Sequence, residues 1–216
     1  MVLNVLNIIV LVTVVVSILA FTNNEISRKL LYIPYEVKNG NNYTRVFGHM
    51  FIHADYMHLG FNMFALYFLG GVFLDTGELR YVGVDDTLVD TYGSLKGQFH
   101  FLILYIFGGL FATLIPYLRH HNNPSYSSLG ASGAVSSVVF AAIIWNPGMT
   151  IHLMFIPFPI PAYIFGPLYL AFEYFADRRG GGNIAHDAHI GGALFGIAYI
   201  LIINIDKGKE FLSYFI

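Results

Sequence analysis

Ser132 lies between glycines in the segment Gly130-Ala131-Ser132-Gly133, directly before an apolar stretch. A serine hydroxyl can attack a carbonyl carbon when a nearby base takes its proton. Glycine lets a substrate backbone approach closely, and the free N–H groups at a helix start can stabilise a developing oxyanion. Two structural explanations compete with this one. Ser132 could cap a helix N-terminus, and the glycines could serve close helix packing.

His189 stands near the start of a second apolar stretch, in the segment Ala185-His186-Asp187-Ala188-His189. A histidine inside a membrane span is costly and is functional by default, although it can also be a hydrogen-bonded tie between helices. The helix dipole and partial burial both favour a neutral ring, which could accept a proton from a serine. Gly192 and Gly196 share a helix face with His189. They would allow close approach to the helix that carries Ser132.

His58 and Asn62 are four residues apart, so a helix would present both on one face. Both side chains can donate hydrogen bonds to an oxyanion. Each residue alone could instead be a structural tie between helices. If they lie at the depth of Ser132, they indicate an oxyanion hole built from side chains.

Six segments come close to the roughly 20 apolar residues that a helix needs to cross a bilayer. They are about 3–21, 57–76, 98–118, 132–146, 160–176 and 188–204. The sequence therefore predicts an all-α membrane protein with six transmembrane helices, as one domain over residues 1–216. The first segment has no preceding Lys or Arg and no small-x-small end, so we expect a retained span rather than a cleaved signal peptide.

The composition agrees with a membrane protein. Of the 216 residues, 56% are hydrophobic and 11% are charged, against about 25% charged in soluble domains. The chain has no cysteine, which excludes disulfides and cysteine-ligated metals. Its basic residues are scattered, so no nucleic-acid partner is expected.

Topology then predicts where the polar residues meet. Successive spans alternate in direction, so the second, fourth and sixth spans begin at the same face of the membrane. The unusual polar residues lie at these three starts: His53, His58, Asn62, Ser132, His186 and His189. Six spans would therefore gather them into one site. The acidic connection over 77–97 is expected to be a solvated loop.

Three motifs together resemble those of the rhomboid intramembrane proteases. They are His58-Leu59-Gly60-Phe61-Asn62, Gly130-Ala131-Ser132-Gly133 and Ala188-His189-Ile190-Gly191-Gly192. The resemblance covers about residues 43–203, and three motifs in order on the expected helices are more specific than any one of them.

The resemblance implies an intramembrane serine endopeptidase that cleaves transmembrane protein substrates near the outer membrane face. Ser132 would be the nucleophile and His189 the general base, then the general acid. The backbone N–H of Ser132, with His58 and Asn62, would hold the oxyanion. Supporting roles fall to His53, Gly130, Gly133, Gly192 and Gly196. No cofactor and no metal are implied, and the expected location is a bacterial inner membrane.

Departures from the family pattern bear on His189. The family often has an aromatic residue four positions after the nucleophile, beneath the histidine ring, and here that residue is Ser136. Tyr43 stands where a tryptophan often precedes the loop-one arginine, here Arg45. Asp187 lies two residues from His189, which points it elsewhere on a helix, so we leave it out of the catalytic group.

Other classes of protein remain as alternatives. A catalytically inactive rhomboid-like protein would bind transmembrane clients without cutting them. A di-iron membrane oxidase would use histidine clusters. The sequence contains only incomplete versions of such clusters: His53 with His58, the pair 120–121, and His186 with His189. A zinc intramembrane protease would need a His-Glu-x-x-His motif, which the sequence lacks.

Overall fold

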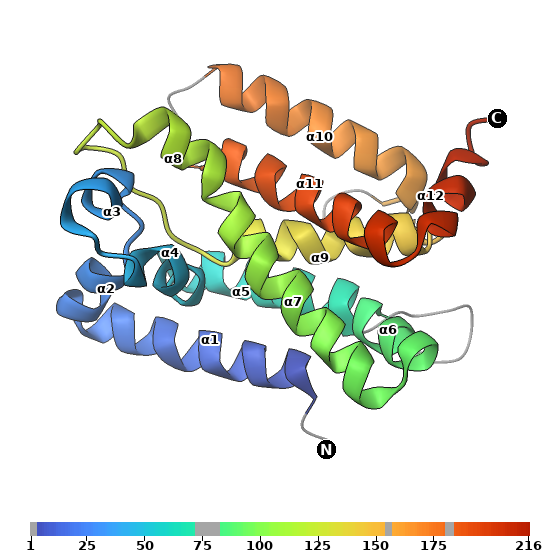
Figure 1. Ribbon diagram of the computed structural model, residues 1–216, viewed down its shortest axis with the longest axis horizontal. Helices are drawn as coiled ribbons and strands as arrows, with labels where there is room; N and C mark the ends of the chain where they lie inside the picture. Colours follow the sequence, from blue (N-terminus) through green and yellow to red (C-terminus); the bar gives the residue numbers. More distant parts are fainter. Residues whose placement is uncertain (1–3, 72–82, 154–156, 180–183) are drawn as a thin grey trace.

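The computed structural model describes residues 4–71, 83–153, 157–179 and 184–216 (Figure 1). The regular elements of the described chain are helices, apart from the two short antiparallel strands β1 and β2. The elements in order are α1 (Val5–Thr22), α2 (Asn24–Leu30), α3 (Pro34–Gly40), α4 (Thr44–Gly48), the 3-10 turn η1 (His49–Phe51), α5 (Tyr56–Gly71), α6 (Val84–Tyr92), α7 (Ser94–Ala112), α8 (Leu114–His120), α9 (Ser132–Trp145), β1 (Thr150–Ile151), β2 (Ile160–Pro161), α10 (Ala162–Arg179), α11 (His186–Ile203) and α12 (Ile205–Leu212).

A helix stands at each of the six predicted spans, which confirms an all-α membrane protein. Within the described residues, α1, the α7–α8 stretch and α11 are long and apolar enough to cross a bilayer. Helix α9 is apolar but has 14 residues, and the described part of α5 has 16. The chain is therefore a multi-pass membrane protein, and the number of six spans stays a prediction.

Helix α9 lies at the centre of the bundle, where it packs against α11, α7 and α5 (Figure 1). It is buried along nearly its whole length. A helix enclosed by protein does not have to match the bilayer thickness itself, which allows it to be short. Helix α1 lies at the edge instead and exposes apolar side chains such as Leu11 and Leu19, 59% and 50% exposed. Such a surface suits contact with lipid.

Glycines allow α9 and α11 to cross in direct contact. A Cβ added to Gly192 would collide with the carbonyl oxygen of Gly133, and one added to Gly196 would collide with that of Ser137. A side chain at either position would force the two helices apart. The predicted close approach of these helices is therefore confirmed.

The loop before α5 is folded into short helices at the end of the bundle where α9 begins. Tyr32 and Ser128 form an antiparallel backbone bridge between this loop and the segment preceding α9. The Arg45 guanidinium donates to the carbonyl oxygens of Arg28 and Leu31, at 2.7 and 2.6 Å. These bonds tie the loop to itself and to the segment that leads to the predicted nucleophile.

The expectation of a solvated loop over 77–97 was wrong for its described part, which forms α6 and the start of α7. In α6, Leu88 is fully buried and Asp85 is 1% exposed. The Asp85 carboxylate accepts hydrogen bonds from Asn4 Nδ2 at 3.0 Å and from Gln98 Nε2 at 2.9 Å. An acidic residue can be buried when amide donors satisfy its oxygens, and acidity alone therefore misidentified this segment.

Candidate active site

Ser132 is the first residue of α9, the central helix of the bundle, and is itself half-buried. Ala131 occupies the N-cap position and no side chain caps the helix, so the N-cap explanation for Ser132 is wrong. Gly130 has φ +116°, a backbone conformation that L side chains rarely adopt. Its Cα faces the imidazole of His58, because an added Cβ would lie 2.7 Å from the ring Cε1. The start of α5 and the turn into α9 are thus in contact, as topology predicted.

His58 presents a hydrogen-bond donor to this turn. Its Nδ1 accepts from the Ala54 N–H at 3.4 Å, which leaves the ring proton on Nε2. That Nε2 is one of the two ring atoms nearest to Gly130. Asn62 is buried one turn along α5, and its Nδ2 donates to the His58 carbonyl oxygen at 2.9 Å.

A chain of hydrogen bonds through His53 connects α1 to the start of α9. The Ser17 hydroxyl donates to the Phe51 carbonyl at 2.9 Å, so its oxygen accepts from His53 Nδ1, also at 2.9 Å. His53 Nε2 is then the acceptor, and it takes the Ala131 N–H at 3.3 Å. This side chain therefore holds the backbone immediately before Ser132.

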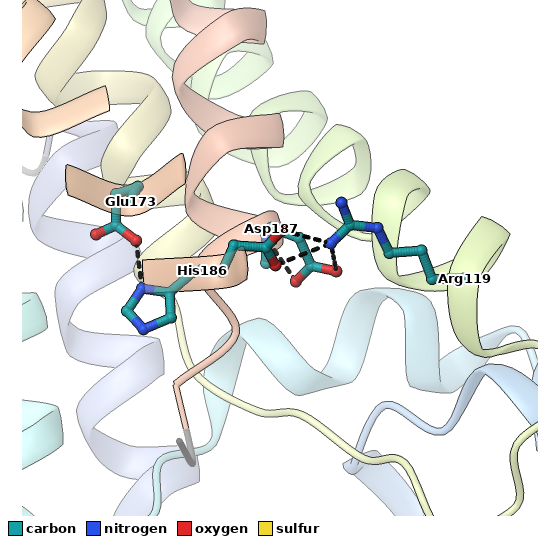
Figure 2. Close-up of polar contacts among 6 residues, drawn as sticks. Arg119, Glu173, His186 and Asp187 are labelled. Carbon is teal, nitrogen blue, oxygen red and sulfur yellow. Dashed lines mark hydrogen bonds and ion pairs between the residues drawn. The ribbon is translucent and has the colours of Figure 1, made fainter. Parts of the chain in front are cut away.

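His189 lies in the first turn of α11 and is bonded to a carboxylate from α10. Its Nδ1 is 3.0 Å from Glu173 Oε1, while His186 Nδ1 is 2.6 Å from Glu173 Oε2. Figure 2 shows Glu173 reaching His186 from the neighbouring helix. An N–H donated to the carboxylate places the His189 proton on Nδ1 and leaves Nε2 as an acceptor.

The crossing of α9 and α11 brings Ser132 and His189 to the same place in the bundle. A Cβ added to Gly133 would lie 3.4 Å from the Ala188 carbonyl oxygen, so the residues next to the serine and the histidine are neighbours. Within the described residues, no hydrogen bond joins Ser132 Oγ to His189. The two residues therefore lie in neighbouring parts of the crossing, and their side chains are not hydrogen-bonded to each other.

Glu173 is the site residue that the sequence analysis missed. It is 3% exposed and lies inside the apolar segment predicted over 160–176. An ionisable residue within a membrane span is a functional candidate by default, and this signal could have identified it. Tyr169, one turn earlier on α10, has its hydroxyl beside both Glu173 and Ser136. Ser136 is thus part of a polar contact between α9 and α10.

Asp187 points away from His189, as predicted from its position two residues earlier. Its carboxylate accepts from Arg119 of α8 at 3.5 Å (Figure 2). It also accepts from the Ala188 N–H at 2.9 Å. Arg119 also donates to both oxygens of Asp177 on α10, at 2.8 Å. These ion pairs join α8, α10 and α11 beside the site. They do not involve His189, which is hydrogen-bonded to Glu173 instead.

The histidine pairs required by the di-iron alternative do not converge in the part of the chain that the structure describes. His120 stacks on Tyr126 with ring centroids 3.9 Å apart, and His121 Nδ1 bonds to the Tyr117 carbonyl at 2.9 Å. Among the described residues, neither histidine belongs to a group of candidate metal ligands. The only group of three candidate metal ligands among the described residues is Glu173, His186 and His189.

Comparisons with known proteins match this arrangement. A family model for the rhomboid domain matches residues 40–205. The chain is 32% identical over 167 residues to a protein of Arabidopsis thaliana named RHOMBOID-like protein 12, mitochondrial, covering 74% of this chain and 45% of that protein. It is 31% identical over 109 residues to the human presenilin-associated rhomboid-like protein, mitochondrial, covering 50% of this chain and 29% of that protein.

The relatives give information on the cellular location of the protein and on the share of their length that this chain matches. Their names place them in mitochondria, so they lend no support to the expected bacterial inner membrane. The chain spans less than half the length of the curated relatives that it matches.

Proposed function

The chain belongs to the rhomboid family, and from that premise we propose that it is an intramembrane serine endopeptidase that cleaves transmembrane protein substrates near the outer membrane face. The observation that carries the proposal is the meeting of three helix starts. His58 lies against Gly130, which begins the turn into α9, and Ala188 lies against Gly133. In this proposal the nucleophile, the base and the oxyanion donors therefore belong to three different helices whose starts are neighbours.

In this proposal Ser132 Oγ attacks the scissile carbonyl while His189 Nε2 takes its proton. Nε2 is the nitrogen suited to this task because Glu173 holds the proton of Nδ1. The carboxylate also stabilises the imidazolium that forms. His189 then gives the proton to the leaving amine, and water hydrolyses the acyl-enzyme with the same histidine as base. Glu173 acts through His189 and is therefore a positioning residue.

The oxyanion is held by the Ser132 N–H, His58 Nε2–H and Asn62 Nδ2. The His58 donor fits because its other nitrogen accepts from Ala54. Asn62 uses one N–H for the His58 carbonyl, and an amide has a second N–H left for the oxyanion. Each such donor is typically worth about 10²–10³ in kcat.

The supporting residues position this machinery. His53 holds the Ala131 N–H and so orients the residue before the nucleophile. Gly130 permits the positive-φ turn in front of the helix. The three glycines of the crossing, Gly133, Gly192 and Gly196, allow α9 and α11 to approach closely.

A second candidate function is client binding without cleavage. It is favoured by the missing hydrogen bond between Ser132 and His189 in the described structure. Catalytic hydrogen bonds are often long without substrate, however, and a passive binder has no need for the Glu173–His189 pair. We therefore place the protease first.

The deciding experiment compares wild type with Ser132→Ala in liposomes that contain a generic transmembrane substrate, with fluorophosphonate labelling in parallel. We expect cleavage and labelling by wild type and neither by the variant. A folded wild-type protein that neither cleaves nor labels would favour client binding. The bacterial inner-membrane location stays a prediction, which fractionation of the source cells checks.

A further inference from the structure

The cluster of Glu173, His186 and His189 has the composition of a metal site. The three ligand atoms, one carboxylate oxygen and one ring nitrogen from each histidine, lie within 4.8 Å of one another. The Glu173 side chain is 4% exposed, and those of His186 and His189 are 15% and 14% exposed. Two helices contribute to the cluster, α10 with the carboxylate and α11 with the histidines.

Two histidines and one carboxylate form a common ligand set for zinc, with a fourth position left for water. Bond lengths near 2.0–2.2 Å separate two ligands of a tetrahedral ion by about 3.3 Å. Here His186 Nδ1 is 2.6 Å from Glu173 Oε2 and His189 Nδ1 is 3.0 Å from the other carboxylate oxygen, Oε1, so the three side chains would have to open by a few tenths of an ångström to admit an ion between them. His186 and His189 are three residues apart on a helix, which places them on one face.

We propose that a divalent transition-metal ion of the zinc type binds Glu173, His186 and His189 and reversibly switches the peptidase off. The inhibitory role rests on the proposed peptidase function, whereas the binding of the metal ion does not. The inference revises the expectation of no metal, which followed from the family resemblance.

The switch follows from the two nitrogens of the His189 ring. In the metal-free site Nδ1 carries the proton and donates it to Glu173, which leaves Nε2 free to accept from Ser132. A metal ion binds the lone pair of Nδ1, so the proton of the neutral ring moves through water to Nε2. A protonated Nε2 cannot take the serine proton. The neutral His189 ring keeps the same number of protons and the same charge in both states, and only the nitrogen that carries the proton differs.

The surroundings of the cluster favour a cation. The Glu173 carboxylate is buried, and a buried charge is stabilised when it coordinates a metal. Arg119 of α8 pairs with Asp177 and with Asp187, and these two ion pairs do not use Glu173. An ion would also join α10 to α11 at the site.

Binding is tested without reference to proteolysis. The protein is the Ser132→Ala variant in detergent, purified without a polyhistidine tag and titrated with Co²⁺ and then with Zn²⁺. We expect the visible absorption of four-coordinate cobalt at one ion per chain, and its displacement by zinc. In the same background, His186→Gln keeps a donor for Glu173 but removes a ligand. We expect affinity to fall by more than about 100-fold, since even outer-sphere changes cost 10–100-fold.

Inhibition is tested on the protein with Ser132 intact. Zinc is expected to stop cleavage by wild type, a chelator to restore it, and His186→Gln to cleave equally well with and without zinc. A folded Ser132→Ala protein that gives no cobalt spectrum, or one whose spectrum survives His186→Gln, would overturn the proposal whatever the protease assay shows. Full cleavage with zinc bound would overturn the switch. Metal binding by a protein that never cleaves would instead contradict the proposed peptidase function.

Discussion

At the residue scale, the decisive feature is which nitrogen of His189 carries its proton. Asp187 is the acidic residue closest to His189 in sequence, yet it bonds to Arg119. Glu173, sixteen positions before His189, accepts from Nδ1. A helix directs residues two apart to different faces, whereas α10 and α11 pack side by side and bring Glu173 opposite the ring.

Replacing Glu173 with glutamine should lower turnover more than substrate affinity. Glutamine cannot neutralise the imidazolium and can turn its N–H₂ toward the ring, which favours the wrong tautomer. We expect kcat to fall roughly 100-fold, at the low end of a general base's contribution, with KM little changed. Asp177→Asn is the matched control, because it removes a carboxylate from the same helix that bonds to Arg119 and not to His189. Equal effects of the two variants on kcat would contradict the positioning role.

His58→Ala and Asn62→Ala should weaken turnover more than folding. If the two side chains hold the oxyanion, each loss should cost about 10²–10³ in kcat. The measurements are kcat in liposomes and the thermal midpoint of the detergent-solubilised protein. A loss of thermal stability proportionate to the loss of activity would identify a structural tie between helices, the alternative that the sequence left open.

At the scale of elements, the crossing of α9 and α11 sets the distance between Ser132 and His189. The two helices touch backbone to backbone, with Gly192 against Gly133 and Gly196 against Ser137. The proposed nucleophile and base stand at the ends of these helices, so a small separation of the helices at the crossing would move both residues. The rest of α9 is enclosed by α5 and α7, which prevents it from following α11.

A methyl group at the crossing should therefore damage both stability and activity. Gly192→Ala is expected to destabilise the protein by about 1–3 kcal/mol, the cost of overpacking, and to abolish most cleavage. Gly60→Ala in α5 is the control, since no atom lies within 4 Å of an added Cβ there. That variant should be neutral or slightly stabilising, because alanine favours a helix over glycine. Thermal unfolding and liposome cleavage are measured on both, and a harmless Gly192→Ala would refute the tight crossing.

At the scale of the whole molecule, the end of α1 remote from the site is held by a buried carboxylate. Asp85 of α6 accepts from Asn4, which precedes α1, and from Gln98 of α7. One side chain thus joins three elements. Burial raises the pKa of Asp85 to about 6, with a further increase from neighbouring Asp86, against a decrease from the Gln98 hydrogen bond.

The raised pKa of Asp85 predicts how its contribution to stability depends on pH. Folded protein binds the Asp85 proton more tightly than unfolded protein does, whose carboxyl titrates near its ordinary value of 3.8. The stabilising contribution is therefore greatest below about pH 4, declines as pH rises to about 6, and is constant above that. A shift of about two pKa units corresponds to about 3 kcal/mol, so relative to Asp85→Asn the thermal midpoint of wild type should fall by roughly 6–12 °C across this window. If the thermal midpoints of wild type and Asp85→Asn changed by the same amount between pH 4 and 6, the result would contradict a raised pKa of the buried Asp85.

Much of the fold and of the site follows from local sequence pattern. Apolar runs identified helices at all six predicted positions, because the period and length of such runs reflect a local property of the chain. Polar residues at alternate helix starts predicted that His58, Ser132 and His189 lie at one end, since chain direction alternates with each crossing. The acidic connection was misjudged because a charged residue shows its partners only when Asn4 and Gln98 have been brought to it.

The sequence by itself determined the class of the protein, the helix positions and the motifs that identify its family. Only the tertiary structure decided that Glu173 orients His189, that His53 holds the residue before Ser132, and that His186 completes a ligand set. The physical reason is that a hydrogen bond between helices depends on how the two helices are rotated and spaced. Here the packing of glycines against backbone at the centre of the bundle sets both quantities.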